Sequence, residues 1–199
     1  VTSTIMGEGK STVSCNLAIT LAQTGARVLL VDCDLRRSSL HEKLGRAPGP
    51  GVTEILAGDV KMGGVIHATD IEGLDLIRAG AVPPNPAELL GSDIMAEFIA
   101  ESRESYTYII LDAPPVLAVT DAPVLTAVTD LVLLVLETGR VPVNAAKRTR
   151  EMLAAVSAPV VGFVFADRTA RNKGCGYSYN YGYGYDQNEP KRSWWRFSN

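Results

Sequence analysis

The sequence contains few residues of the kinds that hold metal ions or form disulfide frameworks. Its 199 residues include three cysteines and two histidines, and the cysteines show no CxxC or other ligand spacing. We therefore expect no zinc site and reduced thiols, as in a cytosolic protein. Long apolar runs are lacking as well. No signal peptide is recognisable, and the run LVLLVLE at residues 131–137 is far too short to cross a bilayer.

The sequence also lacks the basic excess that is typical of nucleic-acid-binding proteins. It has 19 Lys and Arg against 22 Asp and Glu, for a net charge of -3. Acidic residues predominate over residues 1–166, whereas basic residues predominate over residues 167–199. This distribution argues against nucleic acid as a partner. The basic tail could contact an acidic protein face or an anionic membrane, or could remain solvated.

Short β-rich runs alternate with helical patterns over residues 1–166, which predicts an α/β fold with a doubly wound, mostly parallel sheet. Strands are expected at residues 27–32, 74–80, 106–112, 130–137 and 158–165, and helices at 11–25, 92–104 and 141–157. The helix expected at residues 92–104 has Ser92 or Asp93 as its N-cap. RAPGPG and VPPNPAE are expected to be loops. The apolar periodicity stops after Phe165, so residues 1–166 are expected to form one domain and residues 167–199 a disordered tail.

The stretch TIMGEGKST, residues 4–12, lies between a strand and a helix, which is the context of a P-loop. The backbone N–H groups of Gly7, Glu8 and Gly9 are expected to cradle phosphate oxygens at the positive end of the helix. The pattern departs from GxxxxGK[ST] at Thr4, which replaces the first glycine. A P-loop normally follows a full strand, so we expect the sequence to be a fragment that lacks most of its first strand.

The residues that complete this loop are suited to a nucleotide and its metal ion. Lys10 is expected to reach the β- and γ-phosphates, and the Ser11 hydroxyl is expected to ligate Mg²⁺. Thr12, the next residue, is also expected to bind the nucleotide. The sequence therefore predicts a nucleotide site at the start of the first helix.

Aspartates follow two of the expected strands. Asp32 and Asp34 come at the end of VLLVDCDLRR, and Asp112 comes at the end of YIILD. Parallel strands deliver such residues to one carboxyl edge of the sheet, where Mg²⁺ would find hard oxygen ligands. Asp121 in VTDAPV is expected instead to be a helix N-cap.

Five segments, in chain order, resemble the bacterial tyrosine kinase family (BY-kinases): GEGKST, VLLVDCDLRR, AGAVPPNPAELL, YIILDAPPVLAVTDA and the tyrosine-rich tail. These are cytoplasmic kinase domains associated with capsular and exopolysaccharide synthesis. They are P-loop proteins of the branch that includes the partition and septum-site ATPases (MinD/ParA-like). The resemblance covers nearly the whole chain, and its most distinctive element is the DxDxR motif.

The resemblance implies ATP and Mg²⁺ as cofactors and a catalytic set of four residues, Lys10, Asp32, Asp34 and Asp112. Lys10 would bind the triphosphate, and Asp34 and Asp112 would position Mg²⁺. Asp32 would act as general base towards a tyrosine hydroxyl, whose pKa of about 10 keeps it protonated at neutral pH. Arg36 matches the motif arginine, although Arg36 or Arg37 could instead be an interface salt-bridge partner.

The resemblance also implies the substrate and the partners. The phosphoacceptors would be five tail tyrosines, which a neighbouring subunit of a homo-oligomeric ring would phosphorylate: Tyr177, Tyr179, Tyr181, Tyr183 and Tyr185. A membrane-embedded polysaccharide co-polymerase, in cis or as a separate chain, would be the activator, and a protein-tyrosine phosphatase a further partner. The kinase would then lie at the inner face of the bacterial plasma membrane. Relatives commonly end the last strand with Asn, whereas this chain has Ala166 followed by Asp167 at that place. Asp167 could accept a hydrogen bond from the amino group of adenine.

The alternative is a MinD/ParA-like ATPase switch without kinase activity, whose tail serves only for docking. Such ATPases carry a signature lysine at the position that Ile5 occupies here. The absence of this lysine and the presence of the tyrosine cluster favour the kinase.

Overall fold

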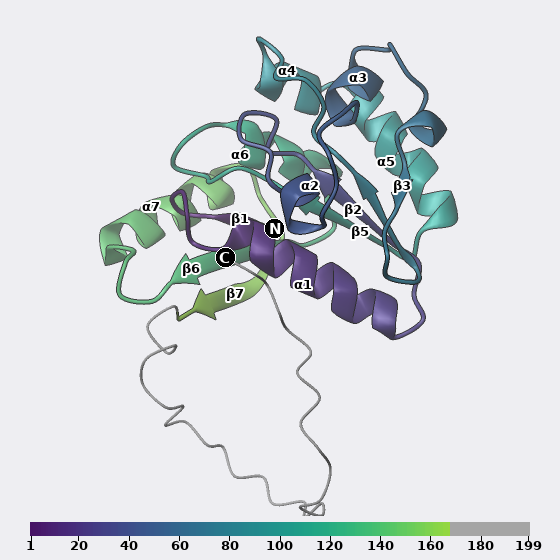
Figure 1. Ribbon diagram of the computed structural model, residues 1–199. Coiled ribbons are helices and arrows are strands. Elements are labelled where there is room, and N and C mark those ends of the chain that lie inside the picture. Colours follow the sequence, from purple (N-terminus) through teal and green to yellow (C-terminus); the bar gives the residue numbers. More distant parts are fainter. Residues whose placement is uncertain (168–199) are drawn as a thin grey trace, which may run out of the picture. The chain divides into compact units, whose positions relative to one another are not determined.

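The computed structural model describes residues 1–167, which form an α/β domain (Figure 1). Its strands, in chain order, are β1 (Thr2–Ser3), β2 (Val28–Asp32), β3 (His67–Ala68), β4 (Leu74–Ile77), β5 (Tyr108–Asp112), β6 (Val132–Glu137) and β7 (Val160–Ala166). Hydrogen bonding orders them as β3-β4-β2-β5 and β1-β6-β7. All strand pairs within these residues are parallel except β3 with β4 at one edge. The predicted mostly parallel sheet is thus confirmed.

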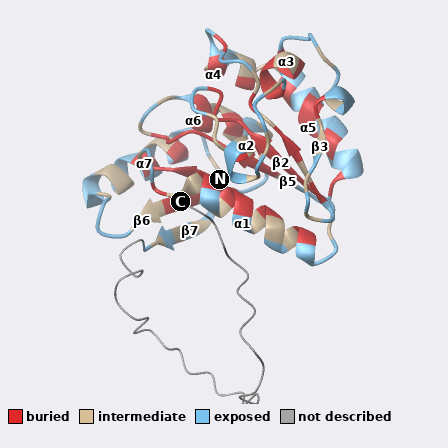
Figure 2. Cartoon of the chain, in the orientation of Figure 1, coloured by how far each residue is buried: buried red, intermediate tan, exposed pale blue. Residues whose placement is uncertain are grey.

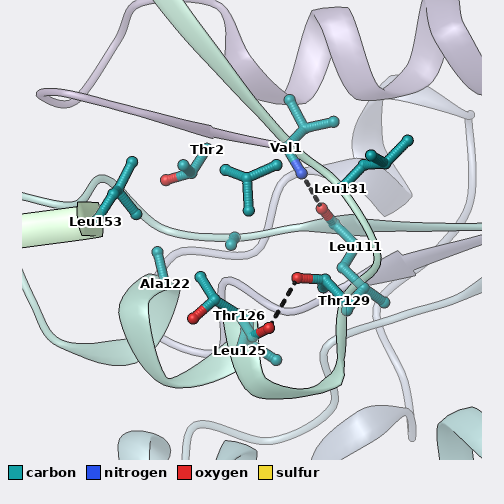
Figure 3. A pocket seen from close by; sticks show the side chains of 11 residues that line it. Val1, Thr2, Leu111, Ala122, Leu125, Thr126, Thr129, Leu131 and Leu153 are labelled. Atoms are coloured by element: carbon teal, nitrogen blue, oxygen red, sulfur yellow. Dashed lines mark hydrogen bonds between the residues drawn. The ribbon is translucent and has the colours of Figure 1, made fainter. Parts of the chain in front are cut away.

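The short strand β1 joins the two groups of strands. The Val1 nitrogen donates to the Leu111 carbonyl of β5 at 2.7 Å, as Figure 3 shows, and the Ala113 amide donates back to the Val1 carbonyl at 2.9 Å. On its other side, β1 pairs with β6 through Thr2 and Leu134. The P-loop therefore begins at the centre of the sheet, between the ends of β5 and β6.

Strand β2 is apolar at successive positions because helices cover both faces of the sheet. Val28 and Leu30 pack with helices α1 (Lys10–Gln23) and α2 (Leu40–Lys43), whereas Leu29 and Val31 pack with helices on the other face. The helices that contribute side chains to the same buried cluster as Leu29 and Val31 include α3 (Val52–Leu56), α5 (Asp93–Ser105), α6 (Asp121–Leu125) and α7 (Val143–Ala155). All five residues of β2 are buried (Figure 2). Each fully buried aliphatic side chain contributes about 1.5–3 kcal/mol, so this strand is a main source of stability.

The long helices end where local signals predict. Helix α1 stops at Gln23, and Gly25 takes the left-handed conformation (φ 87) that commonly ends a helix. Of the two N-cap candidates of α5, Ser92 is the one that caps: its hydroxyl accepts the Met95 amide at 3.3 Å. These caps set the lengths of the helices that flank the sheet.

Several short elements were not predicted. The stretch VPPNPAE was expected to be a loop, but its end starts helix α4 (Pro86–Leu90), with Asn85 as N-cap. The expectation was wrong because proline is compatible with the first helical turn, where its missing N–H is not needed. Helix α2, helix α3, strand β3 and two 3-10 turns, η1 (Met62–Gly64) and η2 (Thr126–Val128), were also missed. At two to five residues, each is too short to show a period.

None of the helices within residues 1–167 has both the length and the apolar character needed to cross a bilayer.

Candidate active site

The Lys10 ammonium lies between two buried carboxylates at the carboxyl edge of the sheet. Its Nζ is 2.9 Å from an Asp34 oxygen and 3.3 Å from an Asp112 oxygen. Burial by itself lowers the pKa of Lys10, but the carboxylates of Asp112 and Asp34 outweigh this effect and raise it above its ordinary value. Lys10 is therefore held as a cation, and it occupies the position where the sequence predicted a metal ion and phosphates to meet.

The backbone around Lys10 fits a phosphate group. Gly7 and Gly9 have φ values of 82 and 92, which only glycine adopts without strain, and a Cβ at Gly9 would meet nothing within 4 Å. Helix α1 starts directly after Gly9, with no side-chain cap and no acidic residue in its first turn. The first-turn N–H groups and the positive end of the helix are thus available to an anion.

Glu8 was predicted to offer only its backbone N–H to phosphate, but its side chain has a second role. The side chain is fully buried, and its carboxylate accepts the Ile5 amide at 2.6 Å and the Glu137 amide of β6 at 3.0 Å. These bonds brace the P-loop from within. Sequence reasoning missed this role because Glu137 lies 129 residues away.

The predicted magnesium ligands Ser11, Asp34 and Asp112 are brought together. Lys10 Nζ contacts the Ser11 hydroxyl at 3.3 Å as well as both carboxylates. Ser14, a residue that the motif does not include, donates its hydroxyl to Asp112 at 3.0 Å and orients that carboxylate. No cluster of three or more His, Cys, Asp or Glu side chains within residues 1–167 is arranged to hold a metal. A hydroxyl and two carboxylates nevertheless suit Mg²⁺, which keeps several waters and binds nucleotide phosphates.

Asp32 is fully buried and holds the segment that follows β2. Its Oδ2 accepts hydrogen bonds from the Ser38 hydroxyl (2.8 Å), the Ser39 amide (3.2 Å) and the Leu40 amide (3.1 Å). Its Oδ1 accepts the Asp34 amide at 3.2 Å. Burial, and then the charge of Asp112, raises the pKa of Asp32 to about 6, although the bonds from Leu40 and Ser38 oppose the shift. A carboxylate with a pKa near neutrality is suited to general base catalysis.

We expect the raised pKa of Asp32 to be visible as pH-dependent stability. The folded state holds a proton that the unfolded chain releases near pH 4, so its stabilising effect is complete below that pH and is lost as pH rises through 6. A pKa raised from 3.8 to about 6 corresponds to about 3 kcal/mol. Urea unfolding without nucleotide should therefore show that the stability of the wild type relative to Asp32→Asn declines by up to this amount between pH 4 and pH 7. A pH-independent difference would contradict the buried, protonatable carboxylate.

Asp121 is not the N-cap that the sequence predicted. Thr120 precedes α6 in the cap position, and the Asp121 carboxylate is fully buried. It accepts two hydrogen bonds from Arg36, at 3.0 Å from Nε and 3.2 Å from Nη2. The motif arginine thus forms an ion pair within its own chain, while the exposed Arg37 donates its backbone amide to Asp34. The prediction was wrong because local sequence cannot show a partner 85 residues away.

Replacing Arg36 by alanine should destabilise the domain, because it leaves the Asp121 carboxylate buried without its counter-ion. Breaking a buried pair costs roughly 3–5 kcal/mol, and the 42% exposure of the Arg36 side chain reduces the expected loss to about 2 kcal/mol. Urea unfolding measures the loss. Arg103→Ala is the matched control, because it breaks an exposed pair with Asp130 and should cost less than about 1 kcal/mol. Equal losses in the two variants would contradict this assignment.

The remaining predicted residues differ in their placement. Thr12 lies exposed in the first turn of α1, and its hydroxyl accepts a hydrogen bond from Lys43 at 3.3 Å. Asp167 lies exposed directly after β7, at the same edge of the sheet as the P-loop. The five predicted phosphoacceptor tyrosines and the tail that carries them lie outside the described residues.

The chain is similar in sequence to a known protein family and to bacterial tyrosine-protein kinases. A family model described as an AAA domain matches residues 5–157. The tyrosine-protein kinase YwqD of Bacillus subtilis is 37% identical over 178 residues, which cover 89% of this chain and 75% of that protein. The tyrosine-protein kinase wzc of Salmonella typhi is 40% identical over 145 residues, which cover 73% of this chain. The chain spans 20% of the length of that second relative.

Solved structures show the same fold. The kinase domain of the Escherichia coli tyrosine kinase ETK has a TM-score of 0.80 and 32% identity, covering 92% of this chain and 70% of that one. The septum site-determining protein MinD of Pyrococcus horikoshii, complexed with Mg-ADP, has a TM-score of 0.69 and 26% identity, covering 84% of this chain and 68% of that one. The nucleotide in the second structure is bound by a protein of similar architecture.

Proposed function

Because the chain belongs to the bacterial tyrosine-protein kinases, and its residues 5–157 match an AAA-domain family model, we propose that it is the catalytic domain of an ATP-dependent protein-tyrosine autokinase. The observation that carries the proposal is the convergence of the Lys10 cation with the buried carboxylates of Asp34 and Asp112 at the uncapped start of α1. This arrangement provides both charges that phosphoryl transfer needs: a cation for the phosphates and oxygen ligands for a metal ion.

The residues present fit Mg·ATP. The backbone of Gly7, Glu8 and Gly9, together with Ser11 and Thr12, would hold the phosphates, and Lys10 would contact the transferred group. The hydroxyl of Ser11 and the carboxylates of Asp34 and Asp112 would hold Mg²⁺, which offsets negative charge on the phosphates when it is bound. Asp167, at the end of β7, would accept a hydrogen bond from the adenine amino group.

Asp32 would accept the proton of the tyrosine hydroxyl. Its pKa of about 6 keeps it mostly ionised at neutral pH while leaving it basic enough to act. Oδ2 is occupied by three donors, whereas Oδ1 accepts only the Asp34 amide among the described contacts. We therefore assign Oδ1 as the proton acceptor. Because Asp32 is fully buried, the acceptor tyrosine would have to gain access to Oδ1 when it binds.

The substrate would be the tyrosine cluster of the tail, Tyr177 to Tyr185 at every second position. We propose that a neighbouring subunit in a homo-oligomeric ring phosphorylates it, and that a membrane-embedded polysaccharide co-polymerase activates the kinase while a protein-tyrosine phosphatase reverses the reaction. The kinase would then act at the cytoplasmic face of the plasma membrane and regulate polymerisation and export of a capsular or extracellular polysaccharide. Nucleic acid has no role in this proposal.

The function is tested by incubating the purified chain with Mg·ATP and probing for phosphotyrosine. Mass spectrometry of the tail should then locate phosphate on the tyrosine cluster. The proposal is wrong if the tail stays unmodified even when a fragment of the membrane activator is added.

The second candidate is an ATPase switch, which the likeness to MinD favours at the level of the fold. Slow release of ADP with no phosphotyrosine would support it. The kinase is the stronger candidate because the similar tyrosine-protein kinases share more of the sequence, 32% to 40% against 26% for MinD.

A further inference from the structure

The turn after β6 holds the P-loop from outside the nucleotide site. Arg140 donates a hydrogen bond from Nη1 to the Gly7 carbonyl at 2.9 Å, across 133 residues of sequence. Beside it, the buried Glu8 carboxylate accepts the Glu137 amide at 3.0 Å. Two bonds of opposite direction thus connect neighbouring residues of the P-loop with one four-residue turn.

This turn is itself well held, so the guanidinium is delivered to a defined place. Arg140 Nη1 also donates to the Glu137 carboxylate at 2.8 Å, and the Arg140 amide donates to the Glu137 carbonyl at 3.2 Å. The Thr138 amide donates to the Ala166 carbonyl at 2.9 Å and ties the turn to the end of β7. Arg140 therefore packs against the P-loop from a braced turn, although 44% of its side chain is exposed.

The contact fixes the orientation of one peptide group. The peptide between Gly7 and Glu8 is trans, so its C=O and N–H point in opposite directions. With the Gly7 carbonyl turned towards Arg140, the Glu8 N–H points away from the guanidinium, into the loop. Gly7 has a φ of 82, and a Cβ there would come within 2.9 Å of Arg140 Nη1. Glycine thus permits both the backbone conformation and the close approach.

We infer that Arg140 is a positioning residue for phosphate binding: by holding the Gly7 carbonyl, it directs the Glu8 N–H towards the phosphates of a nucleoside di- or triphosphate. This inference rests on the proposed nucleotide site. Arg140 does not touch the ligand; it acts through the P-loop backbone. Without the guanidinium, the Gly7–Glu8 peptide is free to rotate. The free energy of nucleotide binding is then reduced by the cost of ordering this peptide.

The test is nucleotide affinity, measured by isothermal titration of the full chain with Mg·ADP. Arg140→Ala should raise the Kd about tenfold, because it removes one charge-assisted hydrogen bond that is partly exposed. Arg140→Lys should recover most of the affinity, since an ammonium can still donate to the Gly7 carbonyl. In kinase assays the KM for ATP should rise with kcat little changed, and the melting temperature without nucleotide should stay close to that of the wild type.

Arg103→Ala is the matched control. Arg103 is similarly exposed, at 51%, and binds Asp130 at 2.8 and 2.9 Å, but it has no contact with the P-loop. Its Kd for Mg·ADP should equal that of the wild type. The inference is overturned if Arg140→Ala binds as tightly as the wild type, or if Arg103→Ala weakens binding as much. If Arg140→Ala does not fold, a Kd for Arg140→Lys more than tenfold above the wild type overturns it. A wild-type chain that binds no Mg·ADP would instead overturn the proposed nucleotide site itself.

Discussion

Replacement of Lys10 by methionine is expected to abolish tyrosine phosphorylation, with a fall in rate of roughly 10³-fold or more. Methionine is unbranched like lysine and only one atom shorter, but it lacks the cation that would stabilise charge on the transferred phosphoryl group. It also leaves the Asp34 and Asp112 carboxylates, 2.9 and 3.3 Å from Nζ in the wild type, without their counter-ion. Phosphotyrosine is measured over time by mass spectrometry, and circular dichroism checks that the variant is folded. A folded variant with more than a tenth of the wild-type rate would contradict the assignment.

The same variant separates transfer within a subunit from transfer between subunits. A Lys10→Met chain that retains its tail is mixed with an active chain that ends after Asp167. Phosphate on the inactive chain requires an intermolecular reaction, which is the expected result. If phosphate appears only when one chain carries both the lysine and the tail, the reaction is intramolecular and the proposed ring is unnecessary.

Asp112→Asn should lower the rate by roughly 10³-fold, because the Asp112 carboxylate is the point at which Lys10, Ser14 and the proposed metal ion meet. The substitution is nearly isosteric, and the backbone bond from the Cys33 amide to the Asp112 carbonyl remains. The charge of Asp112 is also the second cause, after burial, of the raised pKa of Asp32. The pKa of Asp32 should therefore fall in the variant.

Ser14→Ala provides the graded comparison for Asp112→Asn. It removes only the hydroxyl that orients Asp112, at 3.0 Å, and leaves the charge in place. One neutral-to-charged hydrogen bond in this position should change the rate by about 3- to 10-fold. If the two variants lose activity equally, orientation rather than charge is what Asp112 requires.

The main strands and long helices were predictable because each shows its environment in its own residues. Strand β2 is apolar at every position before Asp32, which indicates helices on both faces, and Ser92 marks the start of α5. Helix α4 was missed because Pro86 was interpreted as a loop residue, although proline is also favourable at the start of a helix. Elements that depend on tertiary packing rather than on periodicity leave no such local mark.

The part of the site that short motifs encode was also predictable. The P-loop and the strand-end aspartates follow from short motifs and from the parallel arrangement of the strands, which brings them to one edge. The buried carboxylate of Glu8, the Ser14 hydroxyl and the pair of Arg36 with Asp121 were not predicted, because their partners are 85 to 129 residues away in sequence. Long-range hydrogen bonds of this kind have no periodic signature.

The position of Lys10 between two acidic side chains has a consequence for the order in which ligands arrive. Without nucleotide, these negative charges are partly neutralised by an internal ammonium group, so a divalent ion that arrives alone must compete with the lysine for the same oxygens. When a polyphosphate binds, the ammonium can pair with its phosphates instead, which leaves the carboxylate oxygens available to the metal ion. Nucleotide and magnesium should consequently bind with positive cooperativity, each making room for the other.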